Sequence, residues 1–376
     1  MAILKSCSID SDTSFADESE ISLGDDLLSE IIVRLPFKSV ARSSCVSKNW
    51  RAAVSDDYLR RRLPLHITMV YFPDDDDPAT GGGGGPRFAC AADDGSHRLE
   101  DCDLAFLPFE ERAAVVVCDG RNGLLLCRSP GTPEFYVVEP VTRRWAALPS
   151  PAKEATLSML AFDPSSSLDY RVVNFTGWRD RGAAVEVFSS ETWTWTVHDL
   201  EFGVPASSLS GFMHYHDGAV YILASEPDCV VCLDVAGFSS AVIDLPEPMD
   251  GDGHVAHSGG RLHYVSGGGE LLKVWELDNT SRQWRLKHAV RVEDFVQGGC
   301  RGDEVRFLAL HPEKDDVVYT WSPWKVVEYD LRKKTSCQVW EFRKGERNRV
   351  VKTWLVPSSC YLSDFLAHLS REMLIN

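Results

Sequence analysis

The sequence predicts a multidomain chain that is first α and then all-β: a small N-terminal helical domain followed by a β-propeller of six blades, with seven as the alternative. Three observations support this fold class. Residues 21–63 carry apolar side chains at helical spacing. From about residue 112, short apolar runs rich in Val, Tyr, Phe and Trp alternate with turn residues. These runs recur in five similar units of roughly 45 residues, the period of a propeller blade.

The N-terminus and the composition argue against several classes of protein. Residues 1–20 are polar and acidic, lack the apolar core of a secretory signal and are expected to be disordered. No apolar run is long enough for a transmembrane helix, so no membrane partner is predicted. The net charge of −17 argues against nucleic-acid binding, which depends on neutralising phosphates. No cofactor or metal motif is recognisable, so we predict neither.

Residues 21–63 are predicted to form three short helices. Ser22 and Asp25 have the spacing of a capping box, which places the start of the first helix. Pro36 disfavours helical geometry at the residue before it, so the first helix should end there. Residues 37–41 can form a second helix, and Ser47 is the expected N-cap of a third. The first helix has one broad apolar face, formed by Leu27, Leu28, Ile31, Ile32 and Leu35.

This stretch resembles the F-box of plant proteins. The matching residues keep the family's order and spacing: LGDDLLSEI at 23–31, RLP at 34–36 and CVSKNWR at 45–51. The resemblance implies docking on a Skp-type adaptor, and through it on a cullin, in an SCF (Skp–cullin–F-box) ubiquitin ligase. It also implies which residues form or support the adaptor surface: Leu23, Leu27, Ile31, Leu35, Pro36, Val40, Val46 and Trp50.

The segment departs from the F-box pattern at two places. Gly24 stands where the family usually has proline, which would leave the first helix less firmly started. Ser43 and Ser44 stand where plant members often carry an aromatic residue and an arginine. We therefore expect these positions to weaken the docking.

The charge of the helical segment differs from that of the rest. Between Ile21 and Leu63 there are eight Lys or Arg and five Asp or Glu, a balance of +3 against −20 for the remainder. A basic patch on an acidic protein fits an acidic partner, and Skp-type adaptors are acidic as a family.

Residues 64–362 are predicted to form the propeller. Residues 65–72 are predicted to be a strand, followed by a flexible acidic and glycine-rich loop at 73–86. Five repeat units then follow within roughly 112–345. Residues 64–110 and 353–362 can supply a sixth unit that closes the ring by pairing its two ends. Residues 363–376 are expected to form a short amphipathic helix.

Two kinds of residue mark the repeat. Trp145, Trp195 and Trp284 recur at the repeat period or its double and are expected to pack between neighbouring blades. Strands also end in carboxylates that can cap the turns after them, at Asp234, Asp278 and Asp330. The run NGLLLC…EPVTRRWAALP resembles the F-box-associated domain, and the region as a whole resembles the F-box-associated and Kelch-like propellers of plant F-box proteins.

No motif predicts catalysis, since the chain lacks a GxSxG elbow, an HExxH helix and a paired zinc motif. Two histidine groups could meet in space and bind a metal, although ordinary turn and strand-end positions explain them better: His214 and His216, and His254, His257 and His263. Trp and Arg are enriched at binding hot spots. Two turns carry the residues predicted to bind a protein target: Trp178, Arg179 and Arg181, and Trp321 and Trp324.

The function that best fits these observations is that of a non-catalytic, intracellular adaptor in the cytoplasm, the nucleus or both. Its helical domain would dock on a Skp-type adaptor, and its propeller would bind a protein target for ubiquitination. One alternative is a propeller enzyme, a hydrolase or an oxidoreductase, with an unrelated helical N-terminus. Another is an F-box interaction protein that acts outside the ubiquitin pathway.

Overall fold

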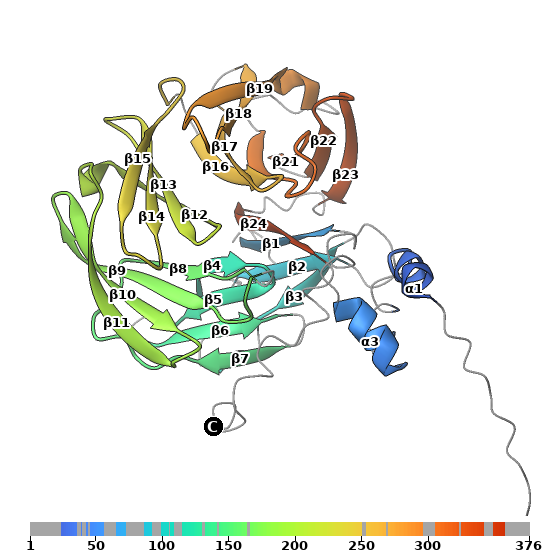
Figure 1. The fold of residues 1–376 in the computed structure, drawn as a ribbon, viewed down its shortest axis with the longest axis horizontal. Coiled ribbons are helices and arrows are strands. Elements are labelled where there is room, and N and C mark those ends of the chain that lie inside the picture. The colour runs from blue at the N-terminus through green and yellow to red at the C-terminus, as the bar shows by residue number, and fades with distance from the viewer. Residues whose placement is uncertain are drawn as a thin grey trace, which may run out of the picture.

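Six four-stranded antiparallel sheets form a ring, with two helices outside it, in the computed structural model (Figure 1). The structure describes residues 24–35, 39, 43, 46–55, 65–72, 86–91, 99–104, 106–108, 115–129, 132–140, 143–163, 166–249, 253–267, 270–295, 305–322, 325–341 and 349–357. The predicted helical segment and β-propeller are confirmed, and no seventh sheet occurs among these residues. The segments 1–20 and 363–376 and all but one residue of the predicted loop 73–86 lie outside them.

Five sheets correspond to the five sequence repeats, and each uses four consecutive strands. Named from the ring centre outward, the first is β4 (Val116–Arg121), β5 (Leu124–Arg128), β6 (Phe135–Glu139) and β7 (Arg144–Ala147). The second is β8 (Leu157–Ala161), β9 (Arg171–Arg179), β10 (Gly182–Ser189) and β11 (Thr194–Glu201). A 3₁₀ turn, η2 (Ala206–Ser208), leads to the third: β12 (Leu209–His216), β13 (Ala219–Ala224), β14 (Cys229–Asp234) and β15 (Ser240–Asp244).

The last two repeats continue the same order. The fourth sheet is β16 (Gly253–Ser258), β17 (Arg261–Ser266), β18 (Leu271–Leu277) and β19 (Trp284–Arg291), followed by η3 (Val292–Phe295). The fifth is β20 (Arg306–Leu310), β21 (Val317–Ser322), β22 (Lys325–Asp330) and β23 (Thr335–Glu341). Since every repeat has the same strand order, equivalent turns lie on the same side of the ring.

The sixth sheet closes the ring with strands from both ends of the propeller region. It has the order β24-β1-β2-β3, where β2 is Arg87–Ala91 and β3 is Leu99–Asp103. Strand β24 (Arg349–Pro357) pairs antiparallel with β1 (Leu65–Phe72) along the whole length of β1. The innermost strands contact one another in the cycle β4, β8, β12, β16, β20, β24 and back to β4. The expected pairing of the two ends is present, and its C-terminal strand begins at Arg349 rather than at Thr353.

The described part of the helical module consists of α1 (Asp25–Ile32) and α3 (Lys48–Ser55). The predicted capping box is wrong, because Gly24 is the N-cap of α1 and has no side chain to cap it. The prediction for Ser47 is confirmed, since its Oγ accepts a hydrogen bond from the Trp50 amide at 3.3 Å. Most of residues 37–41, the predicted second helix, lie outside the described residues.

Helix α1 also ends earlier than predicted, at Ile32. The following residues form turns, in which the amides of Arg34 and Leu35 donate to the carbonyls of Ile31 and Ile32, both at 3.1 Å. These bonds span three residues and tighten the last turn, so the chain leaves the α-helix before Pro36.

The turns between the third and fourth strands share one geometry in five sheets. Each contains one non-glycine residue with positive φ: Arg143, Trp193, Phe238, Arg282 and Lys334. In three of these turns a carboxylate oxygen accepts amide hydrogen bonds at 2.7–3.1 Å, from Ala236 to Asp234, from Thr280 and Ser281 to Asp278, and from Arg332 and Lys333 to Asp330. The predicted capping role of these aspartates is confirmed.

Two of the three repeat-marking tryptophans join neighbouring sheets, as predicted. The Nε1 of Trp195 donates to the Pro149 carbonyl at 2.7 Å, and its ring lies 6.3 Å from that of Phe135 in the preceding sheet. The Nε1 of Trp284 donates to the Asp244 carbonyl of the preceding sheet, also at 2.7 Å. The ring contact of Trp145 is with Tyr136, at 5.7 Å within its own sheet.

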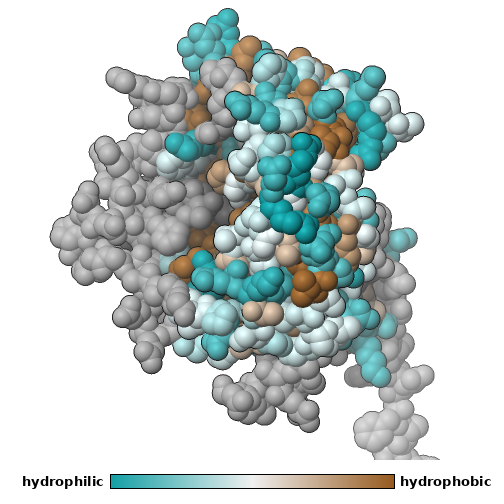
Figure 2. Space-filling model, turned by 90° about the vertical axis from the view of Figure 1, so that its left-hand side faces the viewer, coloured by the Kyte–Doolittle hydropathy of each residue, from teal (hydrophilic) through white to brown (hydrophobic). Residues whose placement is uncertain are grey.

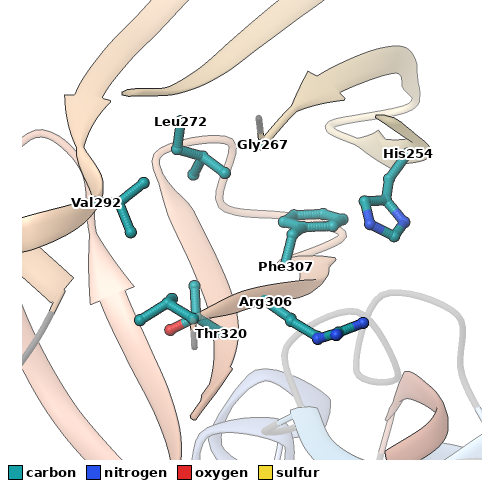
Figure 3. Close-up of a pocket in the computed structure, with 8 residues that line it drawn as sticks. His254, Gly267, Leu272, Val292, Arg306, Phe307 and Thr320 are labelled. Atoms are coloured by element: carbon teal, nitrogen blue, oxygen red, sulfur yellow. The ribbon is translucent and has the colours of Figure 1, made fainter. Parts of the chain in front are cut away.

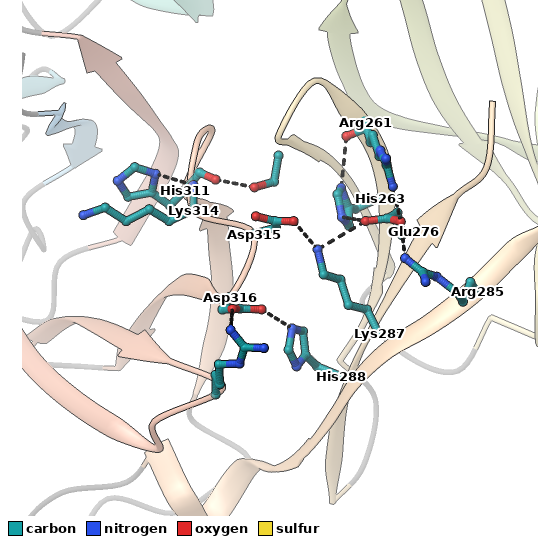
Figure 4. A network of polar contacts seen from close by, with 12 residues as sticks. Arg261, His263, Glu276, Arg285, Lys287, His288, His311, Lys314, Asp315 and Asp316 are labelled. Carbon is teal, nitrogen blue, oxygen red and sulfur yellow. Dashed lines mark hydrogen bonds and ion pairs between the residues drawn. The ribbon is translucent and has the colours of Figure 1, made fainter. Parts of the chain in front are cut away.

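A polar network joins the fourth and fifth sheets (Figure 4). The Glu276 side chain is only 5% exposed and forms ion pairs with Arg261 and Arg285 at 2.7 Å and with Lys287 at 3.2 Å. Lys287 also reaches Asp315 at 2.5 Å, in the segment between β20 and β21. Burial by itself would raise the pKa of Glu276, but hydrogen bonds from the three cations lower it to about 2. This carboxylate therefore links β17, β18 and β19 of the fourth sheet, and through Lys287 it connects that sheet to the fifth.

The outer surface of the ring carries hydrophobic residues in small, separate patches on the side shown in Figure 2, which is otherwise mostly hydrophilic. Val197 on β11 and Val242 on β15 are 62% and 41% exposed. Scattered exposed residues of this kind are normal on a monomer and do not mark an interface.

Gly182 is predicted to be required by a close approach of two strands. A Cβ at this position would lie 2.3 Å from the carbonyl oxygen of Leu200. We expect Gly182→Ala to lower the free energy of unfolding by about 1–3 kcal/mol, measured by urea denaturation. Gly211→Ala is the matched control, since its Cβ would meet nothing within 4 Å. Equal stability of the two variants would contradict the close approach.

The Glu276 network predicts an acid-dependent contribution to stability. Because the folded pKa of about 2 lies below the ordinary glutamate value of 4.5, this contribution is complete above pH 4.5 and is lost as the pH falls toward 2. We expect Glu276→Gln to destabilise the protein at pH 7 by about 2 kcal/mol, and less at low pH. The control is Glu201→Gln. Glu201 is exposed, and its ion pair with Arg179 contributes less than about 1 kcal/mol to stability. If Glu276→Gln lowers stability by the same amount at every pH, the ionised Glu276 is not the source of the acid-dependent contribution.

Candidate adaptor-binding and target-binding surfaces

The two described helices make a small apolar core of their own. Leu28 is 3% exposed and Ile32 is fully buried, and four partly buried residues pack against them: Val33, Leu35, Trp50 and Ala53. The predicted broad face of α1 is thus divided by packing, because Leu28 and Ile32 turn toward α3 while Leu27 turns outward. Apolar side chains on α1 therefore serve two different surfaces.

The structure separates the predicted adaptor-binding residues into three groups. Leu27 is 58% and Val46 is 67% exposed, so both point away from the helical core. Ile31 is half-buried, and Leu35 and Trp50 pack against the core. The remaining predicted residues, Leu23, Pro36 and Val40, lie outside the described residues.

The structure describes one residue at each of the two departures from the F-box pattern, Ser43 and Gly24. Ser43 is 4% exposed and its Oγ donates to the Ser39 carbonyl at 2.7 Å. Gly24 adopts φ −56° and ψ 145°, and a Cβ added there would meet nothing within 4 Å. This φ lies within the range that proline imposes, so the position does not need glycine.

The predicted Trp178 turn is the end of a hairpin rather than an open loop. Trp178 and Arg179 belong to β9, and Gly182 begins β10. Arg179 forms ion pairs with Asp199 at 2.8 Å and Glu201 at 3.2 Å on β11. The side chain of Arg181 donates to the Gly203 carbonyl. The two arginines therefore fasten the hairpin to the strand beside it, and binding a partner would compete with these bonds.

Trp178 itself is 38% exposed and held in a defined orientation. Its ring stacks on Phe175 with centroids 5.6 Å apart, and its Nε1 donates to the Thr156 Oγ1 at 2.5 Å. In the second predicted turn, Trp321 is a half-buried residue of β21, and its Nε1 has no hydrogen-bond partner among the described residues. Trp324 lies outside the described residues.

Both predicted turns lie on one side of the ring. The Trp178 and Trp321 turns each join the second and third strands of a sheet, so they lie on the side where the innermost strands begin. Arg306, the first residue of innermost strand β20, is opposite Trp321 in the register. Aromatic residues near the start of the innermost strands therefore lie on the same side of the ring as both turns.

An aromatic row crosses three innermost strands in their N-terminal part. Phe212 on β12 is 72% exposed, and its ring centroid lies 6.3 Å from that of His254 on β16. His254 lies 5.2 Å from Phe307 on β20. Figure 3 shows His254 and Phe307 next to each other in the lining of a pocket that Arg306 and Thr320 also line. We call Phe212, His254 and Phe307 the upstream mouth.

Sequence reasoning missed the upstream mouth, in which Phe212 is exposed while Phe307 is only 8% exposed and belongs to the core of the fourth and fifth sheets. Phe212 and Phe307 have the ordinary pattern of strand residues, and only the ring brings them together. The two histidine groups do meet elsewhere: His214 Nε2 and His257 Nδ1 are 2.9 Å apart. No cluster of three or more potential metal ligands occurs in the described part of the chain.

The residues that a propeller enzyme would need do not converge. His214 and His216 lie on the innermost strand β12, whereas Asp234 ends and Asp278 directly follows the third strands of two different sheets. Both carboxylates are already engaged by turn amides. The grouping of these four residues that the enzyme alternative requires is therefore not present.

Gly24 offers a test of the helix start. Gly24→Pro should stabilise the helical module by about 0.4–1 kcal/mol, because the observed φ suits proline and proline restricts the unfolded chain. Hydrogen exchange at the amides of α1 measures the effect in the full chain. Gly24→Ala is the control, since alanine is a poor N-cap and should bring no gain. Faster exchange in the proline variant would show that the local backbone differs.

The comparisons with known proteins agree with this organisation. A family model for the F-box domain matches residues 21–62, and one for the β-propeller of F-box protein At3g26010-like chains matches residues 102–361. No helix in the described residues is long and apolar enough to cross a membrane.

Several relatives are Arabidopsis thaliana proteins of similar length. F-box protein At3g26010 is 26% identical, with 83% of this chain and 78% of that protein covered. The putative F-box/kelch-repeat protein At1g15680 is 27% identical, with 83% and 82% covered. With the propeller model matching well over half of its length, this chain belongs to the F-box proteins with an At3g26010-like, F-box-associated β-propeller.

Proposed function

We propose that this protein is the target-recognition subunit of an SCF-type ubiquitin ligase. The observation that carries the proposal is the F-box match over residues 21–62, within which Leu27 and Val46 are exposed while Leu28 and Ile32 form a small core. Exposed apolar residues are common on monomers, so it is their place in the F-box match that favours burial of these two side chains by a partner. In this function α1 and α3 dock on a Skp-type adaptor, which links the chain to a cullin.

The eight predicted residues have different parts in this docking. Leu27 and Val46 contact the adaptor directly, with Ile31 beside Leu27 on α1. Leu35 and Trp50 support the surface from within the core. Leu23, Pro36 and Val40 complete it. The basic balance of the module steers it toward an acidic adaptor.

The propeller captures the protein target at the upstream mouth. Phe212 supplies an exposed aromatic anchor, and Trp178, with Trp321 and Trp324 near the second turn, extends the aromatic surface on the same side of the ring. Arg179 and Arg181 act mainly by holding the hairpin rigid. Rigid aromatic side chains lose little conformational entropy on binding, which suits them to this role. The chain itself is non-catalytic and works inside the cell, where it brings the target to the conjugating enzyme.

Adaptor docking is tested with two substitutions on exposed positions. Leu27→Asp and Val46→Asp should each weaken binding of a purified Skp-type adaptor at least about tenfold, measured by biolayer interferometry, because a charge replaces a buried apolar contact. Val197→Asp on β11, equally exposed but outside the module, should leave the affinity unchanged. Unchanged binding by both helical variants would refute the docking surface.

Target capture is tested at Phe212. Proximity labelling in cells, with and without proteasome inhibition, should reveal proteins that accumulate on inhibition with the normal chain. Phe212→Ser should lose these proteins while keeping the adaptor, and Val197→Ser should keep both. If labelled proteins persist without Phe212, the target binds elsewhere. If they are insensitive to the inhibitor, the chain acts outside the ubiquitin pathway.

A further inference from the structure

A polar cluster lies at the end of the innermost strands opposite to the upstream mouth. It consists of Arg121 at the end of β4, His214 and His216 at the end of β12, and His257 on β16, and we call it the downstream cluster. His214 and His257 share a hydrogen bond of 2.9 Å. The ring of His216 stacks on that of His257 with centroids 4.5 Å apart and planes 12° from parallel. Three sheets thus contribute to one site.

Arg121 is the unusual member of this cluster. Only 8% of the residue is exposed, and its Nε has no hydrogen-bond partner among the described residues. No carboxylate of the described chain lies within ion-pair distance of its guanidinium. A buried guanidinium is costly unless an acceptor satisfies it. Its hydrogen-bonding groups are therefore available to an acceptor from outside the chain.

The imidazoles complement the guanidinium. Burial is the main cause that lowers the pKa of all three histidines, and the Arg121 charge lowers it further. The pKa of His257 falls to about 3. The three imidazoles are neutral at pH 7, so each has one N–H group. One N–H group of the His214 and His257 pair lies in their shared hydrogen bond, and His216 hydrogen-bonds the Gly260 backbone. The pair therefore keeps one N–H group that can donate to a ligand. A further negative charge beside them would offset the Arg121 charge and favour their protonated forms.

The other charged or titratable groups near the cluster come from several elements. They are Asp163 after β8, Arg171 on β9, Tyr215 and Asp217 at the end of β12, and His263 on β17. Asp217 is exposed at its turn, and the carboxylate of Asp163 acts on Arg121 through space without pairing with it. Among the described residues, Arg121 is the buried cation whose charge acts on all three imidazoles.

We propose that the downstream cluster is an oxyanion site that binds a phosphate group, with Arg121 as its charged donor and the remaining imidazole N–H of the His214 and His257 pair as a neutral donor. A guanidinium offers several N–H groups in one plane, which suits the oxygens of a tetrahedral oxyanion. The group can come from free phosphate or from a phosphorylated side chain, and both present the same oxygens. This site is independent of the proposed target binding at the upstream mouth.

The test uses the full-length chain and two probes, inorganic phosphate and O-phosphoserine, with chloride at matched ionic strength as the control. We expect the phosphate probes, and not chloride, to raise the midpoint temperature of thermal unfolding. They should also shift the imidazole NMR signals of His216 and His257. The pKa of both histidines should rise in the bound state. Tighter binding of O-phosphoserine would identify a phosphorylated side chain as the source, and tighter binding of phosphate would identify the free ion.

Variants separate the site from non-specific effects. Arg121→Gln should weaken phosphate binding at least about tenfold. Because Arg121 is buried and its loss can disturb folding, the half-buried His216→Gln is the second variant, with a smaller loss of affinity and a reduced pH dependence. Arg332→Gln, whose side chain is 81% exposed, is the control. Equal responses in all variants, or histidine signals that do not move with phosphate, would overturn the proposal.

Discussion

The pairing of β24 with β1 is the interaction on which the rest of the propeller depends. It joins residues from the two ends of the propeller region, and without it the closing sheet would be split and two inner edges would be left unpaired. Closure also sets the contacts among all six innermost strands. The upstream mouth and the downstream cluster each combine side chains from strands of different sheets, so both exist only in the closed ring.

The helical module and the propeller keep their binding chemistry separate. The module completes a core with Leu28 and Ile32 and leaves Leu27 exposed, which frees one face for a partner without loss of its own packing. In the ring, one end of the innermost strands is aromatic and the other is rich in nitrogen donors. The proposed adaptor, target and phosphate sites therefore use different residues of the chain.

Local interactions were the part of the fold that sequence reasoning predicted well. Ser47 caps the amide of Trp50 only three residues away, and the aspartates at strand ends bond amides within three residues, so residue type and spacing were sufficient. The capping box failed because Ser22 and Gly24 compete for one helix start, and spacing alone does not decide between them. The roles of Arg179 and Arg181 were also missed, because their partners lie about twenty residues further along the chain.

The sequence by itself determined the order of the domains, the repeating unit and the F-box segment, because these depend on periodicity and on neighbours close in the chain. Only the tertiary structure decided which face of α1 is buried, how the two ends pair and which side chains meet at the ends of the innermost strands. Arg121 and His257 are separated by more than a hundred residues, and no local pattern links them. Ring closure brings them together, because every repeat places its innermost strand in the same orientation around one axis.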